Sequence, residues 1–342
     1  MTVSTSLSLP QLDAILDRLP QLTIGLIGDL FLDRYFEIDP NRTETSIETG
    51  LDAYQVVRIR NQAGALGTVM NNLAALGVGR LVPVTVIGTD GLGVDLLHSL
   101  RSLPLESSGI IRSDERLTPT YLKPLLVRPG RPPRELNRLD VRTRVPLSPA
   151  LREELCSRLE KWFTRVDGWI VLDQIDQVDE GVVHHEVRAM LGALSRRAAD
   201  IPLLVDSRRQ LALFEFGSLK GNRSEFTRAT GCEEPAAAAT QLARRSGRPA
   251  YATCGDEGIW VGDPDGATTL VPTRRVSGPI DIVGAGDSAT AGLLCALLCG
   301  LDPANAAAFA NLVASITIRQ LGTTGTASPQ ELRQAIGGDG VS

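Results

Sequence analysis

A glycine-rich stretch near the end of the chain carries the clearest chemical signal in the sequence. It reads Asp281-Ile282-Val283-Gly284-Ala285-Gly286-Asp287-Ser288 and opens an apolar segment that we expect to be helical. Free backbone N–H groups at a helix start, together with the helix dipole, attract an anion such as a phosphate. Glycines there permit close backbone approach and positive φ angles. The stretch therefore predicts an anion site built from Gly284, Ala285 and Gly286.

The carboxylate of Asp287 lies within this predicted anion site, where it would repel a phosphate unless its task is to accept a proton. An aspartate with an ordinary pKa of about 4 is ionised at neutral pH and can take a proton from a hydroxyl group. That hydroxyl can then attack a phosphate held by the backbone amides, which is the arrangement that phosphoryl transfer requires. The alternative is that Asp287 only caps the helix.

Alternating strands and helices must position these groups. The apolar run over 23–28 ends at Asp29, and similar short runs end at Asp173 and Asp206. Ligands gather at the carboxyl ends of parallel strands, so these carboxylates are expected at one edge of a sheet. We predict further strands over 82–87 and 249–253, and helices over 9–19, 64–76, 148–165, 182–197, 287–298 and 304–320. The pattern indicates an α/β fold with a mainly parallel sheet covered on both faces.

Two polar segments interrupt this alternation. Residues 34–62 are rich in Thr, Glu and Arg, and residues 118–141 contain five prolines. Both are typical of exposed antiparallel strands and turns, so we expect them to form a small β-lid beside the main sheet. No internal repeat or low-complexity linker is present, and one domain over 1–342 with this lid is the simplest organisation.

The Asp-x-x-Gly-Ala-Gly-Asp string resembles the second signature of the PfkB (ribokinase-like) family of carbohydrate kinases. Within that family the chain is most similar to the kinase half of the bacterial heptose kinase/adenylyltransferases, over about 22–336. The resemblance implies a three-layer α/β/α fold, ATP and Mg²⁺ as cofactors, and a sugar or sugar-phosphate acceptor, heptose phosphate included. The segments that carry it are Gly28-Asp29-Leu30-Phe31-Leu32-Asp33-Arg34-Tyr35, Asn137-Arg138-Leu139-Asp140, Gly221-Asn222-Arg223-Ser224-Glu225, Leu321-Gly322-Thr323 and Ser328-Pro329-Gln330-Glu331-Leu332.

The resemblance also assigns roles on the nucleotide side. Asp287 would be the general base, and Asn222 and Glu225 would organise Mg²⁺ and phosphate, mostly through water, because Mg²⁺ commonly keeps several waters. Their alternative is a loop cap followed by a solvated acid. Asn311 would lie beside the adenine, or else be a surface residue. The nucleotide-binding turn would include Thr253, Gly255 and Gly258, and a monovalent cation, K⁺ in particular, would bind near Asp281 and Val283.

On the acceptor side, the resemblance implies that Asp29 and Asp33 accept hydrogen bonds from sugar hydroxyls, since a carboxylate can accept several O–H bonds. The alternative for Asp33 is a surface ion pair with Arg34 or another basic residue. Further substrate contacts would come from Gly64, Gly67, Asn71 and Arg138.

The acceptor side also departs from the family pattern. Ala63 replaces the first of two glycines, and Gly67 stands where an asparagine is expected. The lysine that usually follows Asp173 is missing, and Arg208 either substitutes for it, binds a substrate phosphate or is a solvated cation. Phosphoryl transfer is therefore predicted more firmly than the identity of the sugar.

Composition excludes several other classes of protein. The net charge of −5 argues against nucleic acid or an anionic membrane as the main partner. Five scattered cysteines and three histidines favour core positions over a metal cluster. No signal peptide or membrane-length apolar run is visible, so we expect a cytoplasmic protein with one activity. We also expect a homodimer through the lid. The competing hypotheses are a kinase for a nucleoside-like acceptor and a catalytically weak ligand-binding or regulatory protein.

Overall fold

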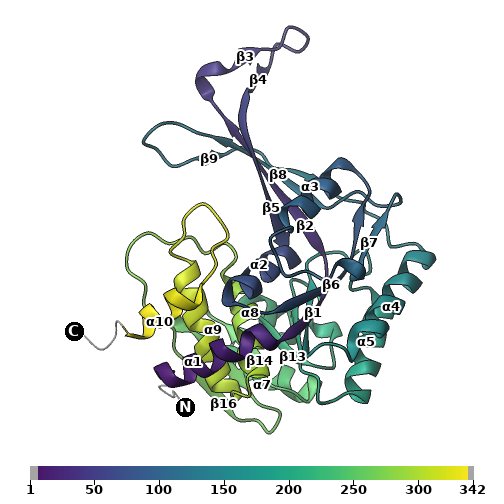
Figure 1. Cartoon of the computed structure of the whole chain (residues 1–342), viewed down its shortest axis with the longest axis vertical. Coiled ribbons are helices and arrows are strands. Elements are labelled where there is room, and N and C mark those ends of the chain that lie inside the picture. The colour runs from purple at the N-terminus through teal and green to yellow at the C-terminus, as the bar shows by residue number, and fades with distance from the viewer. Residues whose placement is uncertain (1–6, 338–342) are drawn as a thin grey trace.

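A nine-stranded sheet forms the centre of the computed structural model, which describes residues 7–337 (Figure 1). Neighbouring strands are parallel except for the pairs β14–β15 and β15–β16. In spatial order the strands are β16 (Thr268–Val271), β15 (Ile259–Gly262), β14 (Ala250–Thr253), β13 (Ser218–Asn222), β12 (Leu203–Ser207), β11 (Gly168–Asp173), β1 (Thr23–Gly28), β6 (Arg80–Gly88) and β7 (Ile110–Ser113).

Helices cover both faces of this sheet because its central strands are buried on both sides. Each face has its own hydrophobic core. One core is formed with α1 (Leu9–Arg18), α2 (Leu66–Leu76), α8 (Ala285–Leu298), α9 (Pro303–Thr317) and α10 (Pro329–Gly337), and the other with α4 (Pro149–Phe163), α5 (His185–Arg197), α6 (Arg223–Thr230) and α7 (Pro235–Ser246). The α/β architecture predicted from the alternating pattern is confirmed.

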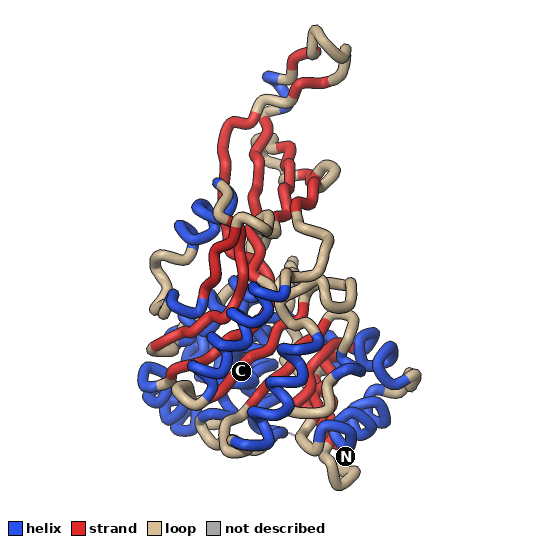
Figure 2. The backbone as a smooth tube through the Cα atoms, turned by 90° about the vertical axis from the view of Figure 1, so that its right-hand side faces the viewer, coloured by secondary structure: helices blue, strands red, loops and turns tan. Residues whose placement is uncertain are grey.

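A second sheet projects from the main body, and Figure 2 shows it rising above the helical layers. Residues 34–62 and 118–141 contribute most of it. We predicted antiparallel strands, but β2 pairs with β8 in parallel while the other pairs are antiparallel. Its strands are β2 (Leu30–Ile38), β5 (Val56–Ala65), β8 (Thr120–Leu126), β9 (Arg134–Glu135) and β10 (Leu139–Val141), and the small hairpin β3 (Glu44–Thr45) and β4 (Asp52–Ala53) lies at its tip (Figure 1).

Two predicted helices begin later than expected. The helix predicted from residue 64 begins at Leu66, because β5 continues to Ala65, whose positive φ of 51° turns the chain into α2. The helix predicted from residue 182 begins at His185, because residues 174–184 form a loop. In the main sheet, strands β7, β13, β15 and β16 were not predicted. Within residues 7–337, no helix combines the length and apolarity needed to cross a bilayer.

Candidate active site

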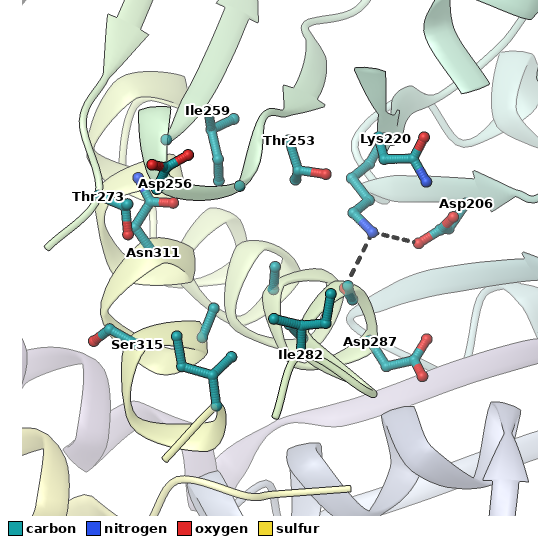
Figure 3. Close-up of a pocket in the computed structure, with 18 of the residues that line it drawn as sticks. Asp206, Lys220, Thr253, Asp256, Ile259, Thr273, Ile282, Asp287, Asn311 and Ser315 are labelled. Atoms are coloured by element: carbon teal, nitrogen blue, oxygen red, sulfur yellow. Dashed lines mark hydrogen bonds and ion pairs between the residues drawn. The ribbon is translucent and has the colours of Figure 1, made fainter. Parts of the chain in front are cut away.

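A cavity of about 920 Å³ opens at the carboxyl ends of strands β11 to β14, and we call it the main cavity. The first turn of α8 closes one side of it, and α9 closes another (Figure 3). It brings together nine residues that the sequence predicted for the phosphoryl-transfer side: Asn222, Glu225, Thr253, Gly255, Gly258, Ala285, Gly286, Asp287 and Asn311. This placement follows from the fold, because parallel strands deliver their carboxyl ends to a single edge.

The start of α8 provides the predicted anion site with fewer amides than expected. Gly284 is the N-cap residue with a left-handed φ of 82°, which favours glycine. The Ala285 N–H donates to the carbonyl of Ile282 at 3.1 Å. Gly286 and Asp287 are the second and third residues of the helix, so their N–H groups have no helical carbonyl one turn earlier to bond. These two N–H groups are therefore the ones best placed to receive an anion.

Asp287 occupies the third position of α8 and lines the main cavity. The N-cap of this helix is Gly284, so the alternative that Asp287 is the capping residue is wrong. Burial and then the neighbouring Asp206 carboxylate raise the pKa of Asp287 to about 7, although the charge of Lys220 lowers it. A carboxyl with a pKa near neutrality is well matched to proton transfer.

Lys220 is a cavity residue that the sequence analysis missed. Its ammonium group donates to Asp206 Oδ2 at 2.7 Å and to the carbonyl of Gly286 at 3.1 Å (Figure 3). The Lys220 side chain is only 5% exposed, so it is held by these partners rather than by water. A lysine within an otherwise apolar strand, two residues before Asn222, was the signal that could have identified it. Lys220 places a positive charge beside the first turn of α8.

Asn222 and Glu225 form a helix cap at the wall of the main cavity. Asn222 is the N-cap of α6, and its side chain accepts from the Glu225 N–H while Glu225 Oε2 accepts from the Asn222 N–H at 2.6 Å. This capping box fixes both side chains at the carboxyl end of β13. Both also line the main cavity, and burial raises the pKa of Glu225. The cap therefore holds a carboxylate at the cavity wall.

The far side of the main cavity is largely apolar. Ile259, Ile282 and Ile318 line it, and a flat base could pack against such side chains. Asn311 is buried rather than on the surface, and its amide donates to the carbonyls of Val271 and Pro272 at 3.0 and 3.3 Å. Thr253 lies at the end of β14, where its hydroxyl donates to the Gly221 carbonyl.

Asp281 joins two loops beside this cavity. Its Oδ1 accepts from the Val283 N–H and its Oδ2 accepts from the Gly322 N–H, both at 3.0 Å. Both carboxylate oxygens thus accept hydrogen bonds from backbone N–H groups. The segment suggested for a monovalent cation forms an ordered contact between two loops in this structure. Neither Asp281 nor Val283 lines the main cavity.

Asp33 lies on β2, buried, on the acceptor side of Asp287. Its Oδ2 is 3.2 Å from the ammonium of Lys123, and its Oδ1 is buried without a hydrogen-bond partner among the described residues. Burial raises its pKa, and its charge in turn raises the pKa of Asp287. The ion pair that the alternative named is therefore present, but it is buried and its cation is Lys123, because Arg34 bonds Asp95 instead. Gly64 lies against the Asp33 carboxylate, where an added Cβ would sit 3.0 Å away.

Unlike Asp33, Asp29 accepts hydrogen bonds from backbone N–H groups with both carboxylate oxygens. Its Oδ2 accepts from the N–H groups of Gln174 and Ile175 at 3.1 and 3.3 Å, and its Oδ1 accepts from that of Val182 at 2.8 Å. Burial raises its pKa. Asp29 therefore anchors the loop over 174–182, the segment that departs from the family pattern after Asp173. Its contact with a substrate stays a prediction.

The two departures from the family pattern, Ala63 and Gly67, are sterically linked. A Cβ added to Gly67 would overlap the Ala63 methyl and would lie 3.2 Å from Leu30 Cδ1. The methyl of Ala63 therefore occupies the space that a side chain at position 67 would need. Asn71 lies one turn further along α2 and is half-buried, outside the main cavity.

Arg138 lies on the second sheet at the edge of the acceptor side. Its guanidinium forms a bidentate pair with Asp140 at 2.7 and 2.9 Å and stacks over the Tyr121 ring, 4.1 Å from the centroid. The charges of Arg142 and Arg208 also act on Tyr121. One arginine thus stacks on this ring, and the charges of two more act on its hydroxyl.

Comparison with known proteins gives consistent results. Residues 215–331 match the model of the pfkB family carbohydrate kinases. The chain is 31% identical over 341 residues to the bifunctional protein HldE of Pseudomonas syringae pv. tomato, and 28% identical over 338 residues to that of Trichlorobacter lovleyi. These alignments cover 96% and 95% of this chain but 65% of each relative, so the chain spans less than two thirds of their length.

Among solved structures, the ribokinase of Arabidopsis thaliana complexed with ribose and ATP has a TM-score of 0.66. The superposition covers 92% of this chain and 98% of that chain at 14% sequence identity. This likeness confirms the ribokinase-like fold.

Proposed function

We propose that the chain is a carbohydrate kinase of the pfkB type and that it transfers the γ-phosphoryl group of ATP to a hydroxyl of a sugar or sugar phosphate. The observation that carries the proposal is Asp287, a carboxyl with a pKa near neutrality on the first turn of α8, beside free backbone amides and Lys220. A proton acceptor next to an anion site is what such a transfer needs.

In the proposed reaction the acceptor hydroxyl gives its proton to the Asp287 carboxylate while its oxygen forms a bond to the γ-phosphorus. The bond from that phosphorus to the β–γ bridging oxygen breaks, and ADP leaves with the electron pair. The amides of Gly286 and Asp287 would stabilise charge on the transferred group, and Lys220 lies 3.1 Å from the Gly286 carbonyl to support the same turn.

The cavity wall also fits Mg²⁺ bound with ATP. Asp206 and Glu225 place carboxylate oxygens at the wall of the main cavity, and such oxygens suit the water shell that Mg²⁺ usually keeps. When bound, Mg²⁺ would neutralise charge on the phosphates. The Ile259, Ile282 and Ile318 surface together with Asn311 would hold the base of ATP. A requirement for K⁺ near Asp281 is part of the proposal.

Asp33 and the nearby arginines support a sugar acceptor with its own anionic group. Asp33 Oδ1 is a buried oxygen with no partner in the described structure, and a sugar hydroxyl could donate to it. Arg138 stacks on Tyr121, and the charges of Arg142 and Arg208 also act on that residue. Guanidinium groups bind phosphate well. An acceptor of the sugar-phosphate class, heptose phosphate included, fits this combination better than an uncharged nucleoside.

Acceptor-dependent release of ADP tests the proposal. Purified protein with Mg-ATP would be offered pairs of sugars with and without a phosphate group, heptose 7-phosphate included, beside a nucleoside. We expect turnover with a phosphorylated sugar, and a lower KM for it than for its unphosphorylated partner. Binding of ATP without turnover on any acceptor would instead favour a ligand-binding protein, the hypothesis that the Ala63 and Gly67 departures support.

We further propose that two copies pair through the second sheet and that the kinase acts in the cytoplasm. Apolar side chains on β5 and at the tip around β3 and β4 are exposed to water when the chain is alone. Ile47 is fully exposed and Leu51 is 70% exposed, and Val56, Val57 and Ile59 are about half exposed. Exposed apolar side chains gathered on one projecting sheet favour an interaction site there.

A further inference from the structure

A strongly basic segment adjoins the acceptor side, and the proposed chemistry does not use most of it. Residues 128–144, which we call the arginine segment, contain six arginines against Glu135 and Asp140, a net charge of +4 in a chain of net charge −5. It runs from the end of β8 through β9 and β10, and Figure 1 shows the β9 loop projecting beside the second sheet. The arginines are Arg128, Arg131, Arg134, Arg138, Arg142 and Arg144.

The tip of this segment keeps its charge uncompensated. Arg128, Arg131 and Arg134 are exposed, and none of them forms an ion pair with any residue in 7–337. Arg138 is paired, with Asp140. Ion pairing would cancel much of the field of a guanidinium at a distance, so the three tip arginines act as free positive charges.

At its base, the arginine segment interacts electrostatically with residues of the reaction site. Arg138 acts on Asp33, and Asp33 acts on Asp287. Arg138 stacks on Tyr121, and the charges of Arg142 and Arg208 also act on that residue. Arg208 in turn lines the main cavity. Arg138, Arg142 and Arg208 therefore extend the positive charge from the tip of the segment toward the main cavity.

The wall of the main cavity carries charges of both signs. Five carboxyl groups, those of Asp173, Asp206, Glu225, Asp256 and Asp287, line it together with Lys220, Arg208, Arg274 and Arg275. The wall alone therefore offers a polyphosphate little net attraction at long range, and its backbone amides act only on contact. A positive surface at the entrance adds long-range attraction during approach, because oppositely charged surfaces raise association rates.

We infer that the arginine segment steers anionic substrates, the nucleotide among them, into the main cavity. This inference rests on the proposed function, since it requires that ATP binds there. Steering acts on the encounter and not on the bound complex. The segment should therefore govern the association rate constant and its salt dependence, and leave the dissociation rate and kcat unchanged.

The test is stopped-flow association of a fluorescent N-methylanthraniloyl derivative of ATP with Mg²⁺. Three proteins would be compared: the wild type, the triple variant Arg128→Gln, Arg131→Gln, Arg134→Gln, and the control triple variant Arg165→Gln, Arg196→Gln, Arg197→Gln. The control removes the same charge from exposed positions after α4 and at the end of α5. Ionic strengths of about 0.01 M and about 0.1 M give screening lengths of about 30 and about 10 Å.

We expect the tip variant to associate on the order of tenfold more slowly than the wild type at low ionic strength. At the higher ionic strength the difference should shrink, and the control variant should match the wild type at both. Equal association rates for all three proteins, or equal losses in both variants, would overturn the inference. Retention of RNA that depends on the tip arginines, with unchanged nucleotide association, would overturn it in favour of a macromolecular polyanion.

The two proposals fail in different ways. A wild-type protein that does not bind the nucleotide at all refutes the proposed function, and the steering inference falls with it. A wild-type protein that binds nucleotide and turns over acceptor, but whose association is insensitive to salt, refutes steering alone. Matching circular dichroism spectra and melting temperatures would show that the variants are folded.

Discussion

Burial and neighbouring charges determine the pKa values of individual side chains in this site. Asp287 lies on the first turn of a helix, where the dipole favours negative charge, yet burial and the nearby Asp206 carboxylate raise its pKa to about 7. Lys220 limits this rise with its positive charge. The result is a carboxyl that can exchange a proton near neutral pH, which the ordinary pKa assumed from the sequence did not anticipate.

The pH dependence of catalysis follows from this pKa. Only the ionised form of Asp287 accepts a proton, so kcat/KM for the acceptor should fall as pH is lowered through about 7 and level off above about 8. The measurement is a pH profile of kcat/KM at saturating Mg-ATP. A profile that stays flat from pH 8 to about pH 5, which an unperturbed aspartate with a pKa of about 4 would give, contradicts the assignment.

Loss of Lys220 should be costly for the fold as well as for activity. Lys220→Met leaves the carboxylate of Asp206 without its cation at a site where both side chains are nearly buried. Breaking such a pair costs about 3–5 kcal/mol, and urea unfolding would measure the loss. Adding Asp206→Asn should recover part of it, while Lys161→Met at an exposed position should have little effect. Equal stability of wild type and Lys220→Met would contradict the description of this pair.

At the scale of single elements, the sequence could predict those site residues whose signals are local. The string from Asp281 to Ser288 predicted the start of α8, because glycines and a following apolar run are local signals. Lys220 was missed because its partners, Asp206 and Gly286, lie 14 and 66 residues away in the chain. Asp29 was predicted at a strand end, but its hydrogen bonds to the 174–182 loop depend on a contact across about 150 residues.

The junction of β5 and α2 should show coupling between its two unusual residues. Gly67→Asn alone places a side chain against the Ala63 methyl and should destabilise the fold by about 1–3 kcal/mol. The double change with Ala63→Gly frees that space, so its cost should be lower than the sum of the single changes by about 0.5–3 kcal/mol. Urea unfolding of the four proteins in this cycle gives the coupling energy.

Gly77→Asn offers a matched control at the other end of α2. Nothing lies within 4 Å of an added Cβ there, and asparagine tolerates the left-handed conformation of a helix C-cap. Its effect should be small. Additive costs for Ala63→Gly and Gly67→Asn would show that the two positions do not compete for the same space.

At the scale of the whole molecule, the α/β class followed from the alternation of apolar runs, whereas the path of the second sheet did not. Its strands come from segments about 60 residues apart, and the parallel pairing of β2 with β8 has no local signal. Its exposed apolar residues were likewise visible only after folding, since alternation in a polar segment does not say which face is left uncovered.

Pairing through the second sheet predicts a dimer in solution. Light scattering after gel filtration should give about twice the chain mass of 36.6 kDa. Ile47→Asp with Val57→Asp should shift the protein to a monomer, because each places a charge on the surface that pairing would bury. Leu9→Asp, at an exposed position on α1, is the control and should leave the dimer intact. A monomeric wild type would refute the proposed interface.

The most direct test of the proposed reaction is phosphoryl transfer by Asp287→Asn beside the wild type at pH 8, with the acceptor that the sugar panel identifies. The change keeps the shape of the side chain and removes the base, and the fold should be no less stable because the surroundings disfavour the charged carboxylate. We predict that transfer falls by roughly 10²–10⁴ while binding of Mg-ATP is retained. Transfer at the wild-type rate in the variant would contradict the role of Asp287 as the base.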